Sequence, residues 1–135
     1  MRVAIVTSKF NHEITEKLYA IAVARLKERN ISDANIHSVW VPGAIEIPLL
    51  AQHLAKQKKY DAIICMGAVI RGETSHYDYV CQQVSYGCQR VALDYHIPVI
   101  FGVLTTEDEA QAESRIQTAR DWVDGAFKMV SLLSE

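Results

Sequence analysis

Short apolar runs alternate along this chain with longer segments in which apolar residues recur every three or four positions. The four apolar runs are Val3–Val6, Ile36–Val41, Ala62–Met66 and Pro98–Leu104. Runs of this length without polar alternation are typical of strands buried on both faces. The intervening periodicity predicts helices over residues 12–29, 46–58, 74–95 and 107–133, the first with Asn11 at its N-cap and Asn30 as its stop.

Strand–helix alternation repeated four times predicts an α/β fold. We expect a single-domain three-layer sandwich over residues 1–135, with a four-stranded parallel sheet and helices on both faces. Right-handed crossovers favour the strand order 2-1-3-4, the flavodoxin-like arrangement. Ligands of such sheets bind beyond the carboxyl ends of the strands, so residues 8–11, 41–46, 67–74 and 101–106 are the candidate site loops.

Composition excludes several classes of partner. The net charge of −2 leaves no basic stripe for nucleic acid, and no run approaches the ~18 apolar residues of a membrane span. Three cysteines without a C-x-x-C pair fit reduced thiols better than disulfides or zinc. Met1–Phe10 is too short for a signal peptide. We therefore expect a cytoplasmic protein with neither a nucleic-acid partner nor a membrane segment.

The loop after the third predicted strand has the features of an anion site. Gly67 and Gly72 allow close approach of the backbone, and Thr74 lies where the next helix is predicted to begin, with Arg71 as a further positive charge. Glu73 would repel a phosphate at close range, so its side chain should point away. The loop lacks the Gly-Lys-Ser/Thr element of a Walker motif, and a plain capped helix start explains the same residues equally well.

His76 follows this loop and is the candidate for proton transfer, since imidazole titrates near neutrality. A histidine bonded to a carbonyl is the competing interpretation. The other four histidines pair with no Cys, Asp or Glu at ligand spacing, so no metal site is predicted.

Two further loop residues have an open interpretation. Phe10 follows a charged residue at a strand end, where its ring would either stack on a flat heterocycle or pack under a loop. Glu46 would either cap a helix dipole or accept hydrogen bonds from sugar-like hydroxyls.

Taken together, the loops resemble the 6,7-dimethyl-8-ribityllumazine synthase family. The matching segments, in order, are Phe10–Asn11, Val41–Pro48, Gly67–Val80 and Pro98–Thr106, with V-I-R-G-x-T-x-H as the most specific element. The resemblance implies a transferase of riboflavin biosynthesis. It would condense 5-amino-6-(D-ribitylamino)uracil with 3,4-dihydroxy-2-butanone 4-phosphate, releasing phosphate and water, and it would need no metal or cofactor.

The resemblance also implies a role for each site residue. Phe10 would stack on the pyrimidine, and Glu73 and Thr74 would bind the phosphate, mainly through backbone amides. The ribityl chain would be held by Ala44, Ile45 and Glu46, and the ring lined by Ala68, Val69 and Ile70. His76 would transfer protons. A neighbouring subunit would contribute Phe101 and Arg115, the latter for the phosphate.

The family assembles as pentamers, and some members build a 60-subunit shell from twelve of them. We therefore expect a homo-oligomer, a pentamer at least, with active sites between subunits. The segment Ile116–Asp124 departs from the glycine- and lysine-rich family pattern. This departure predicts a straighter last helix and a phosphate site that depends more on Arg115, with Arg120 as a candidate substitute for a missing lysine.

Two other functions compete with this assignment. The altered segment is compatible with a catalytically weak relative that only binds flavin-like or ribityl ligands. A response-regulator-like domain would share the fold pattern, but the acidic cluster that it requires at the strand ends is missing.

Overall fold

The computed structural model describes residues 1–135 as a four-stranded parallel sheet in the order β2-β1-β3-β4, which confirms the predicted fold class and strand order. The strands are β1 (Val3–Ser8), β2 (Ile36–Val41), β3 (Ala62–Ile70) and β4 (Val99–Thr106). β1 pairs with both β2 and β3, so the first strand of the chain is a central strand of the sheet. β2 and β4 form the two edges.

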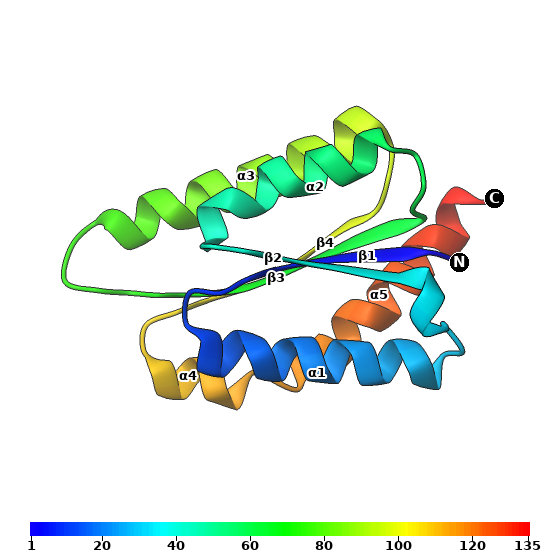
Figure 1. The fold of residues 1–135 in the computed structure, drawn as a ribbon. Helices are drawn as coiled ribbons and strands as arrows, with labels where there is room; N and C mark the ends of the chain where they lie inside the picture. Colours follow the sequence, from blue (N-terminus) through cyan, green and yellow to red (C-terminus); the bar gives the residue numbers. More distant parts are fainter.

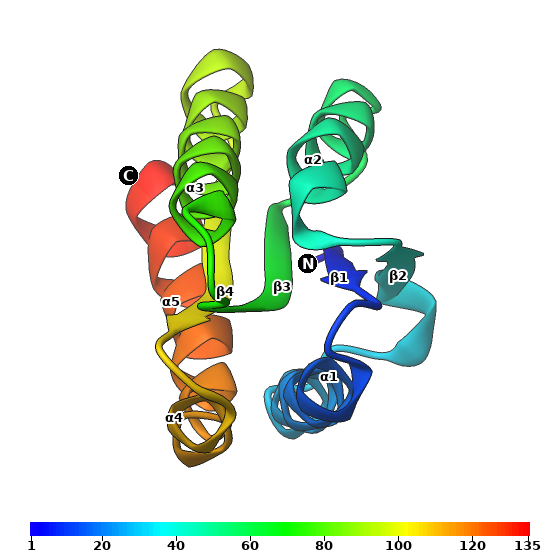
Figure 2. The same cartoon turned by 90° about the vertical axis from the view of Figure 1, so that its left-hand side faces the viewer.

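Helices cover both faces of the sheet. Their bounds are α1 (His12–Glu28), α2 (Ile47–Lys56), α3 (His76–Tyr95), α4 (Glu109–Ser114) and α5 (Thr118–Leu133). In Figure 1, α2 and α3 lie above the sheet, and α1, α4 and α5 lie below it. Figure 2 shows the three layers end-on, with the loops that follow β1 and β3 toward the viewer. Both chain ends lie at the opposite end of the sheet (Figure 1).

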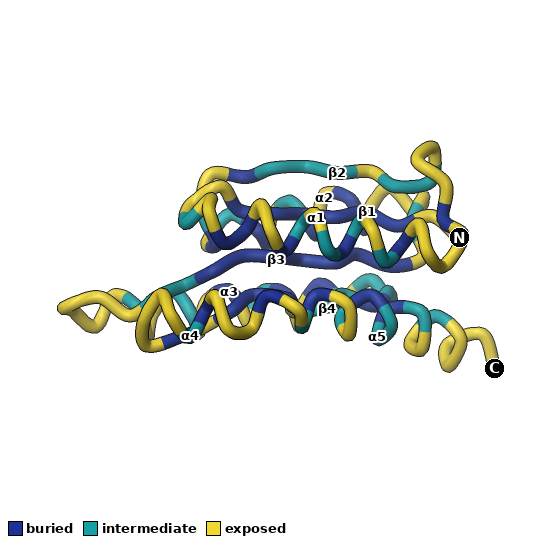
Figure 3. The backbone as a smooth tube through the Cα atoms, turned by 90° about the horizontal axis from the view of Figure 1, so that it is seen from below, coloured by how far each residue is buried: buried dark blue, intermediate teal, exposed yellow.

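The sheet is buried on both faces because successive side chains of a strand point in opposite directions. Along β1, Val3 and Ile5 pack with α1 and α5, whereas Ala4 and Val6 pack with α2 and α3. All six residues of β1 are buried, and Figure 3 shows the same continuous burial along most of β3. Burial at both faces explains why these runs have no polar alternation.

Several element bounds differ from the sequence-based prediction, and three of these differences are the most informative. β3 continues to Ile70, because residues 67–70 pair with residues 103–106 of β4 beyond the end of β1. α3 begins at His76 rather than Thr74. The predicted last helix is divided into α4 and α5 by a turn at residues 115–117, so the expectation of a straighter helix is wrong. At this turn Ile116 packs into the core beside Ala112 and Ala119.

Gly87 is where α2 and α3 approach most closely. A Cβ atom at this position would lie 2.6 Å from Cβ of Pro48 on α2. We expect Gly87→Ala to lower the free energy of unfolding by about 1–3 kcal/mol, because the proline ring cannot move aside without separating the helices. The matched control is Gly125→Ala on α5, where no atom lies within 4 Å and alanine should stabilise by about 0.5–1 kcal/mol. Equal denaturation midpoints for the two variants would contradict this expectation.

An ion-pair network joins α1 to α5. The Asp124 carboxylate accepts hydrogen bonds from Arg25 Nε at 2.8 Å and from Arg29 Nη1 at 3.2 Å. Glu28 accepts from Arg25 Nη1 at 3.0 Å and from Arg120 Nη1 at 3.1 Å. Arg120 is therefore paired with α1, and its predicted role as a substitute for a phosphate-binding lysine is not supported by its position.

This network predicts a pH dependence of stability. The Arg25 guanidinium lowers the pKa of the Asp124 carboxyl below its usual range. A lowered pKa in the folded state adds stability above the ordinary carboxyl pKa of about 4, and this stability is lost as the pH falls through the folded value. Asp124→Asn should therefore lower Tm at pH 7 and flatten its fall toward pH 3. Asp33→Asn is the control, because Asp33 forms an exposed pair with Lys27 only. A Tm profile parallel to that of the unmodified chain would exclude the proposed contribution.

Candidate functional site

A pocket of about 410 Å³ opens at the carboxyl ends of β1 and β3. It lies where parallel sheets of this kind bind ligands. Eight of its thirteen lining residues are hydrophobic. The predicted site residues that line it are Phe10, Ala44, Ile45, Ala68, Val69, Ile70, Thr74 and His76. The structure thus brings eight of the twelve into one cavity.

Phe10 is held by its backbone while its ring is 70% exposed. The amide of Lys9 donates to the Val41 carbonyl at 2.8 Å, and that of Phe10 donates to the Pro42 carbonyl at 3.1 Å. The next residue, Asn11, has φ of 60° and donates from Nδ2 to the Ala68 carbonyl at 2.8 Å. Asn11 occupies the N-cap position of α1, but its side chain does not cap the helix as predicted. Instead it joins the loop after β1 to β3.

The second wall of the pocket follows β2. Ala44 to Glu46 form a 3₁₀ turn before α2, so Glu46 precedes the helix that it was expected to begin. Ala44 and Ile45 line the pocket, whereas Glu46 does not. A Cβ atom on Gly43 would lie 3.2 Å from Oε1 of Glu46, so this carboxylate lies against a residue of the pocket wall.

The loop from Gly72 to Ser75 presents unpaired backbone donors. None of its four amides donates to a protein acceptor, and the loop leads directly into the N-terminus of α3. Free amides at a helix N-terminus bind anions. Thr74 Oγ1 accepts from the amide of His76 at 3.2 Å. Glu73 is exposed and outside the pocket lining, which agrees with the expectation that its side chain points away.

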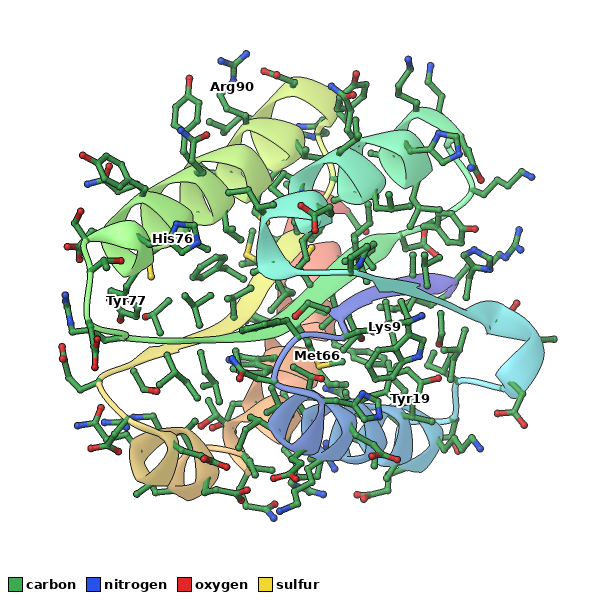
Figure 4. All side chains as sticks on the ribbon, turned by 60° about the vertical axis from the view of Figure 1, so that its left-hand side comes forward. Lys9, Tyr19, Met66, His76, Tyr77 and Arg90 are labelled. Carbon is green, nitrogen blue, oxygen red and sulfur yellow. The ribbon has the colours of Figure 1, made fainter.

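His76 stands in the first turn of α3 and lines the pocket. Figure 4 shows it at the end of α3 that faces the carboxyl ends of the strands, with Tyr77 beside it. Its imidazole forms no hydrogen bond within the chain; only its backbone amide is bonded. The competing interpretation, a histidine bonded to a carbonyl, therefore does not describe this residue.

Tyr77 also lines the pocket and was not among the predicted site residues. Burial raises the pKa of its phenol. Asn11, Gly43 and Gly72 also line the pocket and lie in the predicted site loops, whereas Val80 lies outside them. Val80 lies one helical turn after His76, so helical spacing from the histidine would have identified it.

A comparison with known families identifies the family of the chain. The family described as 6,7-dimethyl-8-ribityllumazine synthase matches residues 1–134. The chain belongs to this family. Two relatives with the same description, from the Dugway strain and a second strain of Coxiella burnetii, are each 55% identical over 139 residues. These alignments cover 99% of this chain and 92% of each relative.

Among solved structures, a de novo designed Rossmann fold protein matches with a TM-score of 0.51 and 14% sequence identity. The match covers 93% of this chain and 96% of that protein. At this identity the likeness shows the fold alone.

Besides Glu46 and Glu73, two other residues assigned by the lumazine synthase resemblance lie outside this pocket. Phe101 is on the edge strand β4, opposite Cys65, and is 38% exposed. Arg115 follows α4, is exposed, and donates from Nη1 to the Gln111 carbonyl at 3.1 Å. Both side chains are on the surface of their own chain.

No group of three or more His, Cys, Asp or Glu side chains is arranged to hold a metal ion. None of the helices has the length and apolar character needed to cross a bilayer. All three cysteines are free, and the hydrogen bond that the Cys65 thiol donates to Cys88, together with burial, raises the pKa of Cys65 well above its usual value.

Proposed function

We propose that this chain catalyses the reaction of its family, the condensation of 5-amino-6-(D-ribitylamino)uracil with 3,4-dihydroxy-2-butanone 4-phosphate to 6,7-dimethyl-8-ribityllumazine. The observation that carries the proposal is the combination of an exposed aromatic ring, a row of free amides and an unpaired imidazole around one pocket. These features match a flat heterocycle, a phosphate and a proton transfer, respectively.

In this proposal the pyrimidine stacks on Phe10 and lies against Ala68, Val69 and Ile70. The ribityl chain extends along Ala44 and Ile45 toward the carboxylate of Glu46, which accepts hydrogen bonds from its hydroxyls. The volume of about 410 Å³ is in the range of small-molecule sites.

The phosphate of the second substrate occupies the loop from Gly72 to Ser75. Backbone amides hold it, so the carboxylate of Glu73 is tolerated as long as it faces solvent. The Thr74 hydroxyl helps to shape the loop by accepting the His76 amide.

The chemistry requires positioning more than activation. The substrate amine attacks the ketone and forms an imine with loss of water. Phosphate then leaves by elimination, and the second amine closes the ring with loss of another water. Holding both substrates in one pocket contributes up to about 7–11 kcal/mol in ideal cases. His76 takes and returns the protons that these steps exchange. No metal or cofactor is required.

We propose a homopentamer with each site shared between two subunits. Phe101 and Arg115 are exposed and outside their own pocket, which is the placement needed for residues that complete a neighbour's site. Large apolar side chains also remain exposed on α2 and α3, namely Leu49, Tyr79, Tyr86 and Leu93. Apolar surface of this extent is typical of subunit contacts. Three free thiols favour the cytoplasm as its location.

The test is a fluorescence assay of the purified protein with both proposed substrates, with phosphate release measured in parallel. Lumazine formation well above the spontaneous rate, with one phosphate released per product, supports the proposal. Product at the spontaneous rate with tight ligand binding would identify a flavin-pathway binding protein instead.

A further inference from the structure

Arg71 directly follows β3 and makes three contacts that hold its guanidinium in place. Its Nε lies 2.8 Å from Oε2 of Glu107, and its Nη2 lies 3.3 Å from Oδ1 of Asp78. The guanidinium carbon lies 4.4 Å from the centre of the Tyr77 ring, within the range of a cation–π contact. These partners belong to two different segments, the first turns of α3 and the residue after β4.

The contacts of Arg71 hold both ends of the loop from Gly72 to Ser75 in place. The Arg71 amide donates to the Thr106 carbonyl at 2.9 Å, which fixes the loop's beginning to β4. The same residue's side chain reaches Asp78 and Tyr77, just beyond the loop's other end. Between these points the loop is exposed, and a Cβ atom at Gly72 would have no neighbour within 4 Å. Few other contacts therefore restrain the four free amides.

Two nitrogen atoms of the Arg71 guanidinium are already paired with carboxylates, those of Glu107 and Asp78. Glu107 is itself held, since its amide donates to Oε1 of Gln111 at 2.8 Å. A phosphate bound by Nε or Nη2 of Arg71 would displace a carboxylate, and a phosphate at any edge of the guanidinium would meet the negative charges of Glu107 and Asp78. The expectation that Arg71 adds charge to the anion site thus gives way to a different role.

We propose that Arg71 is a positioning residue that holds the Gly72–Ser75 amides and the first turn of α3 in the geometry that binds the substrate phosphate. The inference rests on the phosphate site of the proposed function and adds to it a residue that acts through the loop. Because the guanidinium contacts Tyr77, the neighbour of His76, the same contact fixes the turn that carries the imidazole.

The deciding variant is Glu107→Gln, which is nearly isosteric and replaces an exposed side chain. If Arg71 positions the loop, loss of the ion pair should raise KM for the butanone phosphate by about 3–10-fold. If Arg71 instead bound phosphate directly, release from Glu107 would lower that KM or leave it unchanged. A lowered or unchanged KM overturns the proposal.

Arg71→Ala should raise the same KM by about 10-fold or more while KM for the pyrimidine changes by less than about twofold. Arg71→Lys keeps the charge but not the fork, so it should recover little of this loss. The double variant with Glu107→Gln should be no worse than Arg71→Ala alone, because both changes break one pair. Full recovery by lysine would indicate direct phosphate binding by charge and would also overturn the proposal.

Arg29→Ala is the matched control. Arg29 pairs with Asp124 at 3.2 Å and its guanidinium lies 3.9 Å from the centre of the Phe127 ring, so it makes the same two kinds of contact as Arg71 but outside the pocket. It should leave KM for the phosphate substrate unchanged. An equal rise in KM for the Arg29 and Arg71 variants would show that the effect is general destabilisation and would reject the proposal.

Titration with inorganic phosphate, followed by phosphorus NMR, separates this inference from the proposed function. It needs no turnover, so it gives a result even if the unmodified chain forms no lumazine. Weaker phosphate binding by Arg71→Ala and Glu107→Gln than by Arg29→Ala supports the positioning role. Equal binding by all three variants overturns it.

Discussion

Replacement of His76 by alanine is expected to lower kcat for lumazine formation by about 10²-fold and to leave both KM values within about threefold. The imidazole lines the pocket without a hydrogen-bond partner in the chain, so its loss removes a proton carrier and leaves no buried group unpaired. Residual turnover above the spontaneous rate should remain, because the pocket still holds both substrates together.

Steady-state kinetics across pH give the measurement. The pH profile of kcat should differ between the unmodified chain and His76→Ala. His53→Ala on α2 is the control, since this histidine is exposed and outside the pocket. An unchanged kcat and an unchanged pH profile for His76→Ala would show that His76 does not transfer protons in the reaction.

Replacement of Arg115 by alanine is expected to raise KM for the butanone phosphate by about 10–100-fold. A hydrogen bond between charged groups contributes about 1.5–3 kcal/mol, which corresponds to this range. Arg120→Ala is the control, because Arg120 is five positions away in sequence but pairs with Glu28 on α1. It should affect stability without changing the affinity for phosphate. Retained affinity in Arg115→Ala would show that this guanidinium does not bind the substrate.

Co-expression of the two variants tests whether sites are shared between subunits. A mixed ring contains some interfaces in which an intact His76 from one chain meets an intact Arg115 from the next. Random mixing should restore about one quarter of the unmodified activity, although each variant alone is impaired. Activity equal to the average of the separate variants would place both residues in one subunit's site.

The fold could be predicted from the sequence wherever burial alone determines the element. Val3–Val6 and Ala62–Met66 are apolar throughout because both sheet faces are covered, and their assignment as parallel strands is confirmed. The end of β3 was missed because Gly67 to Ile70 are strand residues only through pairing with β4, a partner more than thirty residues away. The turn at residues 115–117 was missed for a similar reason, since the packing of Ile116 in the core is a tertiary effect.

The sequence allowed most residues of the site to be predicted, but not the hydrogen bonds and ion pairs that they form. Strand-end placement and the family motifs identified Phe10, Thr74 and His76, which share the pocket. No local pattern indicated that the Asn11 side chain would donate to the Ala68 carbonyl instead of capping α1. Nor could the sequence indicate that Arg71 would pair with Glu107, because the two residues are 36 positions apart in the sequence and meet only where the loops after β3 and β4 lie side by side. Polar side chains with several possible partners are assigned only by the folded geometry.

The anchoring of Phe10 has a consequence for the thermodynamics of ligand capture. Its backbone amide donates a hydrogen bond to the Pro42 carbonyl at the end of β2, and the side chain of the adjacent Asn11 donates one to the Ala68 carbonyl of β3. The ring of Phe10 nevertheless projects into solvent. Ordering a mobile loop or side chain around a ligand opposes binding, and a ring that is already in place loses little conformational entropy on contact. The heterocycle therefore meets a stationary platform, and loop closure need not limit the rate of its association.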